Sequence, residues 1–263
     1  MSPTRTRSSR LRATWFAATI AAFLLLPSSA TAQSSGIRVV TDAAGARLEV
    51  DGRDFLVRGI NWDYFPVGQN YAYNFWAQPD DMIRAALDRE MSLLRAMGVN
   101  AVRQYAGVPP RWVKYIYETY GIYTVVNHPL GRYGLTINGV YTASTDYSNP
   151  AARAQLLKEV TTLVDEFRGV PGVLMWLLGN ENNYGLTWKS AATENLPQGE
   201  RDAAKARFLY SLVGEAARAI KQRDATRPVA LANGDVQYID IIAQEAKGLD
   251  VFGTNVYRGL SFG

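Results

Sequence analysis

Short apolar runs alternate regularly with amphipathic helical segments along this chain, and this order limits the folds that it can adopt. Hydrophobic side chains recur at helical spacing in five segments, at residues 80–97, 110–120, 156–167, 208–220 and 239–246. Between them, short runs predict six strands, at residues 55–61, 99–105, 122–127, 172–182, 228–235 and 250–257. Because a strand–helix–strand crossover brings the chain back in its original direction, this order favours an α/β fold with a parallel sheet.

A short β-hairpin is predicted ahead of that alternation, at about residues 37–58. Two apolar-alternating runs flank Asp51 and Gly52, a residue pair typical of tight hairpin turns. The strand at residues 47–50 is therefore an addition to the six strands of the repeating pattern.

Polar residues stand at the C-terminal end of every predicted strand. In chain order they are Asn61 and Asp63, Arg103 and Gln104, Asn127 and His128, Asn180 and Glu181, Asn233 and Asp235, and Asn255 and Tyr257. A series of this kind is typical of a (β/α)8 TIM barrel, whose active site is built from that one face. The competing doubly wound sheet is disfavoured, because the first strand-to-helix turn lacks G-x-G-x-x-G and no phosphate loop is present. We therefore predict a TIM barrel with about six of its eight strand–helix units in this chain.

The fourth strand, "VLMWLLGNEN", is too apolar for a strand with one face in water and indicates burial on both faces. Glu181 follows where such a strand would emerge into a cleft. A carboxyl group in that position is partly desolvated, which suits it to hold a proton near neutral pH. The alternative is that "GNEN" forms only a polar loop.

Composition removes several kinds of site. The chain has no cysteine and one histidine, His128, so disulfides, thiolate ligands, a cysteine nucleophile and a multi-histidine metal site are excluded. We expect no metal and no cofactor.

The first 32 residues have the pattern of a signal peptide. Four arginines precede an apolar run at residues 13–26, and Ala30 and Ala32 form an A-x-A cleavage site, which predicts Gln33 as the mature N-terminus. The run is shorter than the roughly 20 residues of a membrane span, although an uncleaved anchor is the alternative. The pattern predicts a secreted or periplasmic protein without stable membrane association after cleavage.

The same leader accounts for the basic pI of about 9.2. Without its four arginines the chain has 24 basic and 24 acidic residues. The remainder has no basic stripe of the kind that binds nucleic acid, so no nucleic-acid partner is expected. The sequence does not indicate an oligomeric state.

The segment "VLMWLLGNEN" resembles the acid/base segment of glycoside hydrolase family 2, and more broadly of the clan of retaining glycosidases built on the TIM barrel. "FLVRGINW", "MGVNAVRQY" and "DVFGTNVYRG" resemble the first, second and sixth barrel strands of that family, so the likeness covers residues 47–263. It implies that residues 33–263 are a catalytic domain of an exported retaining β-glycosidase. The implied substrate is an uncharged or weakly charged oligo- or polysaccharide.

The resemblance also implies roles for individual residues. Glu181 matches the general acid/base, and Asn180 matches the amide that hydrogen-bonds the sugar's 2-hydroxyl. Arg103 matches an arginine that supports the nucleophile, with a salt bridge at the barrel rim as the alternative.

Four further candidates rest on weaker signals. Tyr257 matches a tyrosine near the nucleophile, with packing as the alternative. His128 is either a sugar contact or a structural hydrogen-bonding residue. Trp62 and Trp188 lie next to strand ends and are candidates for stacking on sugar rings.

One departure from the family concerns the nucleophile. A retaining reaction needs a second carboxylate, which the family places at the end of the seventh strand, and this sequence reaches only the sixth. The nucleophile is therefore expected beyond residue 263. Asp235 and Asp63 are strand-end acids that could instead serve as the base of an inverting reaction.

Two other functions stay open at this point. "GINWDYFP" and "MGVNAVRQYAGVPPRWV" are also similar to fungal β-1,3-glucanosyltransferases of the same clan, which would make the protein a β-glucan transglycosylase. A carbohydrate-binding pseudoenzyme is the non-catalytic alternative.

Overall fold

The computed structural model describes residues 1, 36–105 and 107–259. The chain divides into the units Met1–Gln33 and Ser34–Gly263, and the fold below is that of the second. Apart from Met1, the predicted signal peptide and its cleavage point lie outside the described residues. Within those residues, none of the helices combines the length and apolarity that a membrane span needs.

Six parallel strands form one curled sheet. They are β4 (Gly59–Asn61), β5 (Ala101–Gln104), β6 (Tyr123–His128), β9 (Val173–Leu178), β10 (Val229–Gly234) and β11 (Val251–Asn255). Each strand pairs with the next one in this list, so spatial order follows chain order. The predicted parallel sheet is confirmed, and Glu181 follows its fourth strand.

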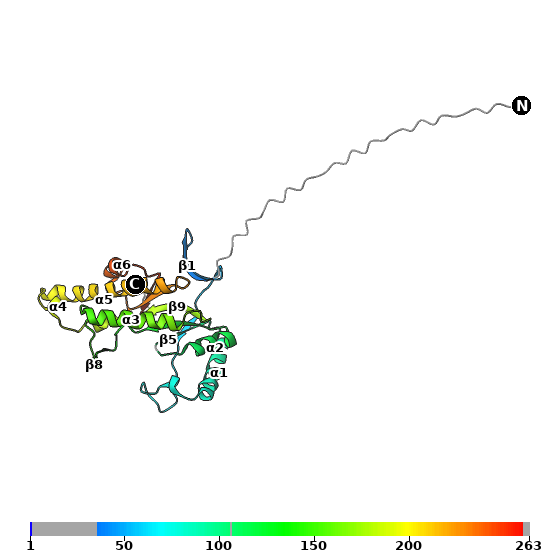
Figure 1. Cartoon of the computed structure of the whole chain (residues 1–263), viewed down its shortest axis with the longest axis horizontal. Helices are drawn as coiled ribbons and strands as arrows, with labels where there is room; N and C mark the ends of the chain where they lie inside the picture. The colour runs from blue at the N-terminus through cyan, green and yellow to red at the C-terminus, as the bar shows by residue number, and fades with distance from the viewer. Residues whose placement is uncertain (2–35, 106, 260–263) are drawn as a thin grey trace. The chain divides into compact units, whose positions relative to one another are not determined.

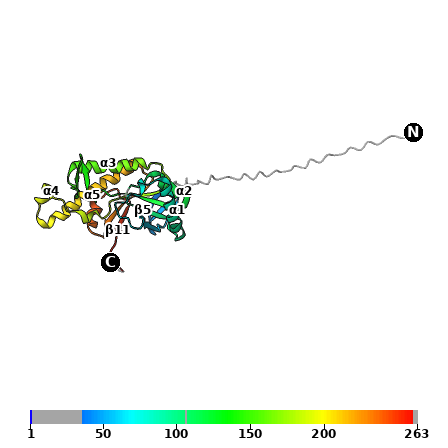
Figure 2. The same cartoon turned by 90° about the horizontal axis from the view of Figure 1, so that it is seen from below.

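The five predicted helices connect these strands. They are α1 (Asp80–Ala96), α2 (Pro110–Tyr120), α3 (Pro150–Glu166), α5 (Gln198–Arg223) and α6 (Ile239–Glu245), and a short α4 (Ala191–Glu194) precedes α5. Asn149 sets the start of α3, because its side chain accepts hydrogen bonds from the first free backbone N–H groups. Helices α3 and α5 lie side by side (Figures 1 and 2).

The first barrel strand is shorter than its sequence predicts. The run at residues 55–61 yields only β4, and the residues just before it form β3 (Arg53–Asp54) in a separate sheet. Phe55 still donates its N–H to that sheet. The Asn100 side chain accepts a hydrogen bond from Arg58 N at 2.7 Å and donates one to Leu56 O at 2.8 Å. These bonds hold the backbone between β3 and β4, so β4 begins only at Gly59.

The region of the predicted hairpin folds as a three-stranded antiparallel sheet of β1 (Ile37–Asp42), β2 (Gly45–Val50) and β3. Asp51 and Gly52 turn the chain between β2 and β3 with φ values of 49° and 74°, as in the tight turns that suit hairpins. Ile37 donates its N–H to the oxygen of Thr226, just before β10. The small sheet thus contacts the N-terminal side of the barrel and leaves the C-terminal strand ends uncovered by it.

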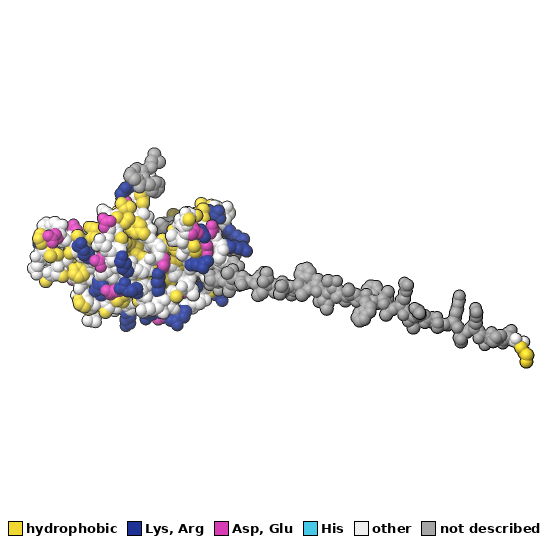
Figure 3. Space-filling model, turned by 90° about the horizontal axis from the view of Figure 1, so that it is seen from above, with side chains coloured by type: hydrophobic (Ala, Val, Ile, Leu, Met, Phe, Trp, Pro, Cys, Tyr) yellow, Lys and Arg dark blue, Asp and Glu magenta, His cyan; other side chains and the backbone are white. Residues whose placement is uncertain are grey.

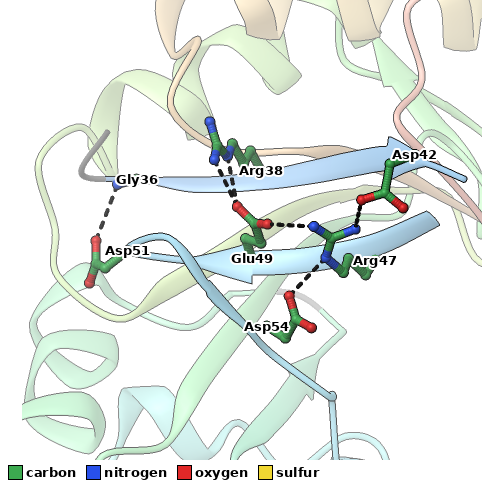
Figure 4. Close-up of polar contacts among 7 residues, drawn as sticks. All are labelled: Gly36, Arg38, Asp42, Arg47, Glu49, Asp51 and Asp54. Atoms are coloured by element: carbon green, nitrogen blue, oxygen red, sulfur yellow. Dashed lines mark hydrogen bonds and ion pairs between the residues drawn. The ribbon is translucent and has the colours of Figure 1, made fainter. Parts of the chain in front are cut away.

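A charge network holds this small sheet together (Figure 4). The buried carboxylate of Glu49 accepts hydrogen bonds from Arg38 at 2.8 and 3.0 Å and from Arg47 at 3.1 Å. Arg47 also binds Asp42 and Asp54, so one guanidinium links all three strands.

On the face shown in Figure 3, basic and acidic side chains are interspersed with uncharged ones.

The sheet is buried on both faces at its fourth strand, as the apolar sequence predicts. Trp176 packs edge-to-face with Phe167 of the helix layer and is 1% exposed. Its neighbour Leu177 packs on the inner face with Ala230 and Ala232. Because successive side chains of a strand point to opposite faces, β9 needs apolar residues at nearly every position.

A second hairpin, which the sequence interpretation missed, lies between β6 and α3. Its strands are β7 (Leu135–Ile137) and β8 (Val140–Thr142). Asn138 and Gly139 form the turn with φ values of 49° and 79°. This hairpin extends the loop that follows the third barrel strand.

Candidate active site

Side chains from the ends of β5, β9 and β11 meet at the C-terminal edge of the sheet. Arg103 from β5 donates from Nη2 to Oδ1 of Asn180 at 2.8 Å, and Asn255 from β11 donates from Nδ2 to Oε1 of Glu181 at 2.7 Å. The parallel order explains this convergence, since the carboxyl ends of all the strands lie at one edge.

Glu181 is the third residue after β9 and lies within the turn there, where it has an unusual backbone conformation. Its φ of 56° and ψ of 40° lie in the left-handed region, which non-glycine residues adopt at a cost. Its N–H donates to the oxygen of Ala232 at 2.9 Å, which fixes this conformation to β10. Such strained residues cluster at functional sites.

The two carboxylate oxygens of Glu181 differ in their contacts. Oε1 accepts hydrogen bonds from Asn255 Nδ2 and from the Tyr257 hydroxyl. No hydrogen bond from the described residues reaches Oε2. Because both donors fix Oε1, Oε2 is the oxygen that can carry a proton toward a ligand.

The Asn180 amide has a defined orientation. Arg103 can only donate, so the atom that it binds must be Oδ1, and Nδ2 then donates to the Tyr133 hydroxyl at 2.7 Å. Nδ2 carries two hydrogens, and this contact uses one of them. The second is available to a ligand.

Arg103 is half-buried beneath Asn180. Its Nε and Nη2 donate to Oδ1 of Asn127 at 3.1 and 2.7 Å, and its guanidinium lies 4.6 Å from the ring centre of Tyr105. Burial lowers the pKa of Arg103, while nearby tyrosines and Glu181 oppose that effect. Arg103 forms no ion pair with the described residues, so the rim salt bridge considered from the sequence is absent there.

Tyr257 extends from the end of β11 and is 72% exposed. Its hydroxyl donates to the Glu181 carboxylate, and this hydrogen bond raises the pKa of Tyr257. The resemblance placed this tyrosine near the nucleophile. In the structure its partner is the acid/base candidate.

Two asparagines that the sequence interpretation did not assign anchor the turn around Glu181. Asn182 is 4% exposed; its Oδ1 accepts from Asn180 N at 2.8 Å, and its Nδ2 donates to Leu130 O at 2.9 Å and Tyr147 Oη at 2.8 Å. It thereby ties the turn to the loop after β6.

Asn183 makes the corresponding attachment to β10. Its Oδ1 accepts from Gly234 N at 2.8 Å and its Nδ2 donates to Gly234 O at 2.9 Å, so the amide pairs with backbone as a neighbouring strand would. The sequence signal for these two residues is the cluster of asparagines around one glutamate, at residues 180–183. Buried backbone N–H and C=O groups need hydrogen-bond partners, and the asparagine side chains supply them.

His128 lies outside this cluster. Its Nδ1 accepts from Leu130 N at 3.1 Å, and its Nε2 is 3.5 Å from Oε2 of Glu159 on α3. Burial lowers the pKa of His128, and Glu159 opposes that effect. Since Asn127 points inward to Arg103, His128 must point outward to the helices. Of the two predicted roles, the structure supports the structural one.

The two predicted stacking tryptophans are buried. Trp62 is 6% exposed and packs among Tyr64, Phe75 and Trp76. Trp188 is 4% exposed, with Tyr147 at 5.3 Å between ring centres. Rings this enclosed do not offer a face to a sugar, so the stacking prediction is corrected to a packing role.

Of the two strand-end acids considered as alternative bases, Asp235 is held in an ion pair. Arg258 binds Asp235 at 2.9 Å, and its hydrogen bond lowers the pKa of Asp235. The Asp63 carboxylate accepts from the N–H of Tyr64 at 3.0 Å. The described residues also contain no cluster of three or more histidine, cysteine or acidic side chains that could hold a metal ion.

Solved structures share this fold. A β-glucuronidase from Parabacteroides merdae superposes with a TM-score of 0.56 at 18% identity, over 85% of this chain and 22% of that one. A β-mannanase from the blue mussel Mytilus edulis gives a TM-score of 0.56 at 12% identity, over 85% of this chain and 75% of that one. Identities this low show the fold alone.

Curated relatives and a family model match the sequence itself. A β-galactosidase from Lactococcus lactis is 26% identical over 151 residues, which are 57% of this chain and 14% of that protein. One from Aeromonas hydrophila is 27% identical over 161 residues, 60% of this chain and 14% of that protein. The chain thus spans about a seventh of these relatives. The family model described as glycosyl hydrolases family 2, TIM barrel domain, matches residues 45–257. This match confirms the predicted (β/α)8 fold class, and it shows that the chain belongs to glycosyl hydrolase family 2.

Proposed function

We propose that this chain carries the acid/base side of the active site of a retaining β-glycosidase, with Glu181 as the general acid/base. The observation that supports it is the pair Asn180–Glu181 after the fourth strand, with each side chain hydrogen-bonded by a residue from a strand two places away in the sheet. The family and its β-galactosidase members support β-glycoside hydrolysis as the reaction.

Glu181 would act through Oε2. Asn255 and Tyr257 hold Oε1, so the proton on Oε2 faces the leaving glycosidic oxygen in the first step. In the second step the same oxygen, now deprotonated, takes a proton from the attacking water. Hydrogen bonds that orient the carboxylate lower the cost of reaching this geometry.

Asn180 would bind the substrate through its second Nδ2 hydrogen. In retaining glycosidases a hydrogen bond to the sugar's 2-hydroxyl strengthens in the transition state. Arg103 fixes Oδ1 of this amide at 2.8 Å, so the Nδ2 group is presented in one orientation. Arg103 acts here as a positioning residue.

The substrate we propose is a neutral oligo- or polysaccharide. We also propose export to the periplasm or medium, which the leader pattern in the sequence supports. We assign no nucleophile among the described residues, where Asp235 is bound by Arg258.

The test is the Glu181→Gln substitution in the protein expressed from its natural gene. Loss of the proton should lower kcat/KM by roughly two to four orders of magnitude on glycosides with poor leaving groups. Activated aryl glycosides should lose far less in bond cleavage, because their leaving groups need little protonation. Glu166→Gln, at the exposed end of α3, is the matched control. Equal losses on both substrate types would remove Glu181 from the acid role.

A further inference from the structure

Tyr133 combines exposure with a direct contact to the candidate site. It lies on the loop between β6 and α3, just before the β7–β8 hairpin. Its side chain accepts a hydrogen bond from Asn180 Nδ2 at 2.7 Å, yet the residue is 60% exposed.

The hydrogen-bonding capacity of this pair is not exhausted. A phenol can accept and donate, and toward Asn180 the Tyr133 oxygen is the acceptor. Its own O–H is engaged by no other described residue. Asn180 also keeps one Nδ2 hydrogen, so two donor groups whose heavy atoms lie 2.7 Å apart each have a hydrogen that no other described residue accepts.

The loop that carries Tyr133 is fixed in advance. Tyr141 donates from its hydroxyl to the Tyr133 carbonyl at 3.0 Å, and a Cβ at Gly134 would stand 2.6 Å from that hydroxyl. Thr145 Oγ1 donates to Gly131 O at 2.7 Å. Because these contacts hold the backbone, ligand binding would not have to order the loop.

Arg132 adds an electrostatic effect. Its guanidinium lies 5.6 Å from the centre of the Tyr133 ring. A cation over an aromatic face is attracted to the ring, so this contact helps to hold the Tyr133 side chain in place. The ring is still exposed enough to contact a sugar.

We propose that Tyr133 is a substrate-contacting residue that determines specificity. Its phenolic O–H donates to a ring hydroxyl of the sugar bound at Asn180, and the pair selects β-glycosides in which that hydroxyl is free and unsubstituted. This inference rests on the proposed function, since it uses the sugar position that Asn180 defines.

The experiment compares the natural protein with Tyr133→Phe on a nitrophenyl β-glycoside and on its monodeoxy analogues at each ring position. The parent sugar is the one turned over fastest among β-galactoside, β-glucoside, β-glucuronide and β-mannoside. Tyr133→Phe should lower kcat/KM on the parent by roughly 2- to 12-fold, the loss expected for one neutral hydrogen bond. On one deoxy analogue this loss should be clearly smaller than on the others, because that substrate has already lost the partner of the phenol and only the contact with Asn180 is removed.

Tyr120→Phe is the control, since its hydroxyl binds Asp88 in the helix layer at 2.6 Å. The ratio of kcat/KM for Tyr120→Phe to kcat/KM for the natural protein should be the same on every analogue. Calorimetry with the methyl glycosides of the same panel gives the same comparison without turnover.

An equal effect of Tyr133→Phe on the parent and all analogues, in both turnover and binding, would overturn the inference. The Glu181→Gln result decides the proposed function separately. A second outcome is that Glu181→Gln loses activity mainly on poor leaving groups while the Tyr133→Phe loss is the same on every analogue. That pair of results would support the proposed function and would remove only the role of Tyr133.

Discussion

The side chain of Asn182 accepts the backbone N–H of Asn180 at 2.8 Å, so this amide bridges the turn on either side of Glu181. Gly179 directly precedes Asn180 and has a φ of 75°. A Cβ at this position would stand 2.6 Å from Oδ1 of Asn182, the same oxygen that accepts from Asn180 N. The turn that presents the acid/base candidate therefore depends on one buried amide and on one residue without a side chain.

Asn182→Ala should affect both stability and acid catalysis. Removing the amide leaves buried backbone groups without partners, at an expected cost of about 1–3 kcal/mol in the free energy of unfolding. Glu181 should also lose its fixed orientation, so kcat should fall more on poor leaving groups than on activated ones. Urea unfolding and a leaving-group series measure the two effects. The exposed Asn195→Ala is the control, and a uniform loss on all substrates would limit Asn182 to stability.

Gly179→Ala should destabilise the protein more than Gly121→Ala. Both glycines have positive φ, 75° and 67°, so both substitutions carry the backbone cost of roughly 1–2 kcal/mol for an L-residue. Only at Gly179 does the new methyl meet the Asn182 side chain, since nothing lies within 4 Å of the position at Gly121. Thermal unfolding of the two variants gives the comparison. Equal losses would contradict a crowded turn.

His128 should make stability depend on pH. Burial lowers the pKa of His128 in the folded state, so the folded protein binds this proton less readily than the unfolded chain. Its stabilising contribution is complete above the unfolded pKa of about 6.5 and is lost as the pH falls through the folded value. His128→Asn retains an acceptor for Leu130 N but does not titrate. The stability difference between wild type and variant should shrink as the pH falls below about 6.5; a constant difference would contradict a buried neutral His128.

Much of the fold could be predicted because its signals are local. Helix α1 and strand β9 each carry the hydrophobic period of their own element, and the order of elements implies a parallel sheet. Parallel pairing in turn places Arg103, Asn180 and Glu181 at one edge. The site was therefore foreseeable as a set of strand ends.

What could not be predicted depends on which way a side chain points. Asn127 and His128 are adjacent polar residues, yet one binds Arg103 inside the barrel and the other contacts α3. Trp62 and Trp188 follow strand ends but turn into packed aromatic groups. Tyr133 depends on a loop whose one usable signal was the Asn-Gly pair at residues 138 and 139, a strong hairpin marker.

Azide rescue of Glu181→Ala, in the protein expressed from its natural gene, tests whether Glu181 is the acid/base. Without Glu181, an activated aryl β-glycoside should still form the glycosyl-enzyme, but water should attack slowly for lack of a general base. Azide needs no base and fits the space that the side chain leaves. We predict that azide restores turnover and gives a β-configured glycosyl azide, identified by NMR. Full activity of Glu181→Ala without azide, or an active wild type with no azide rescue of the variant, would contradict the role of Glu181 as acid/base.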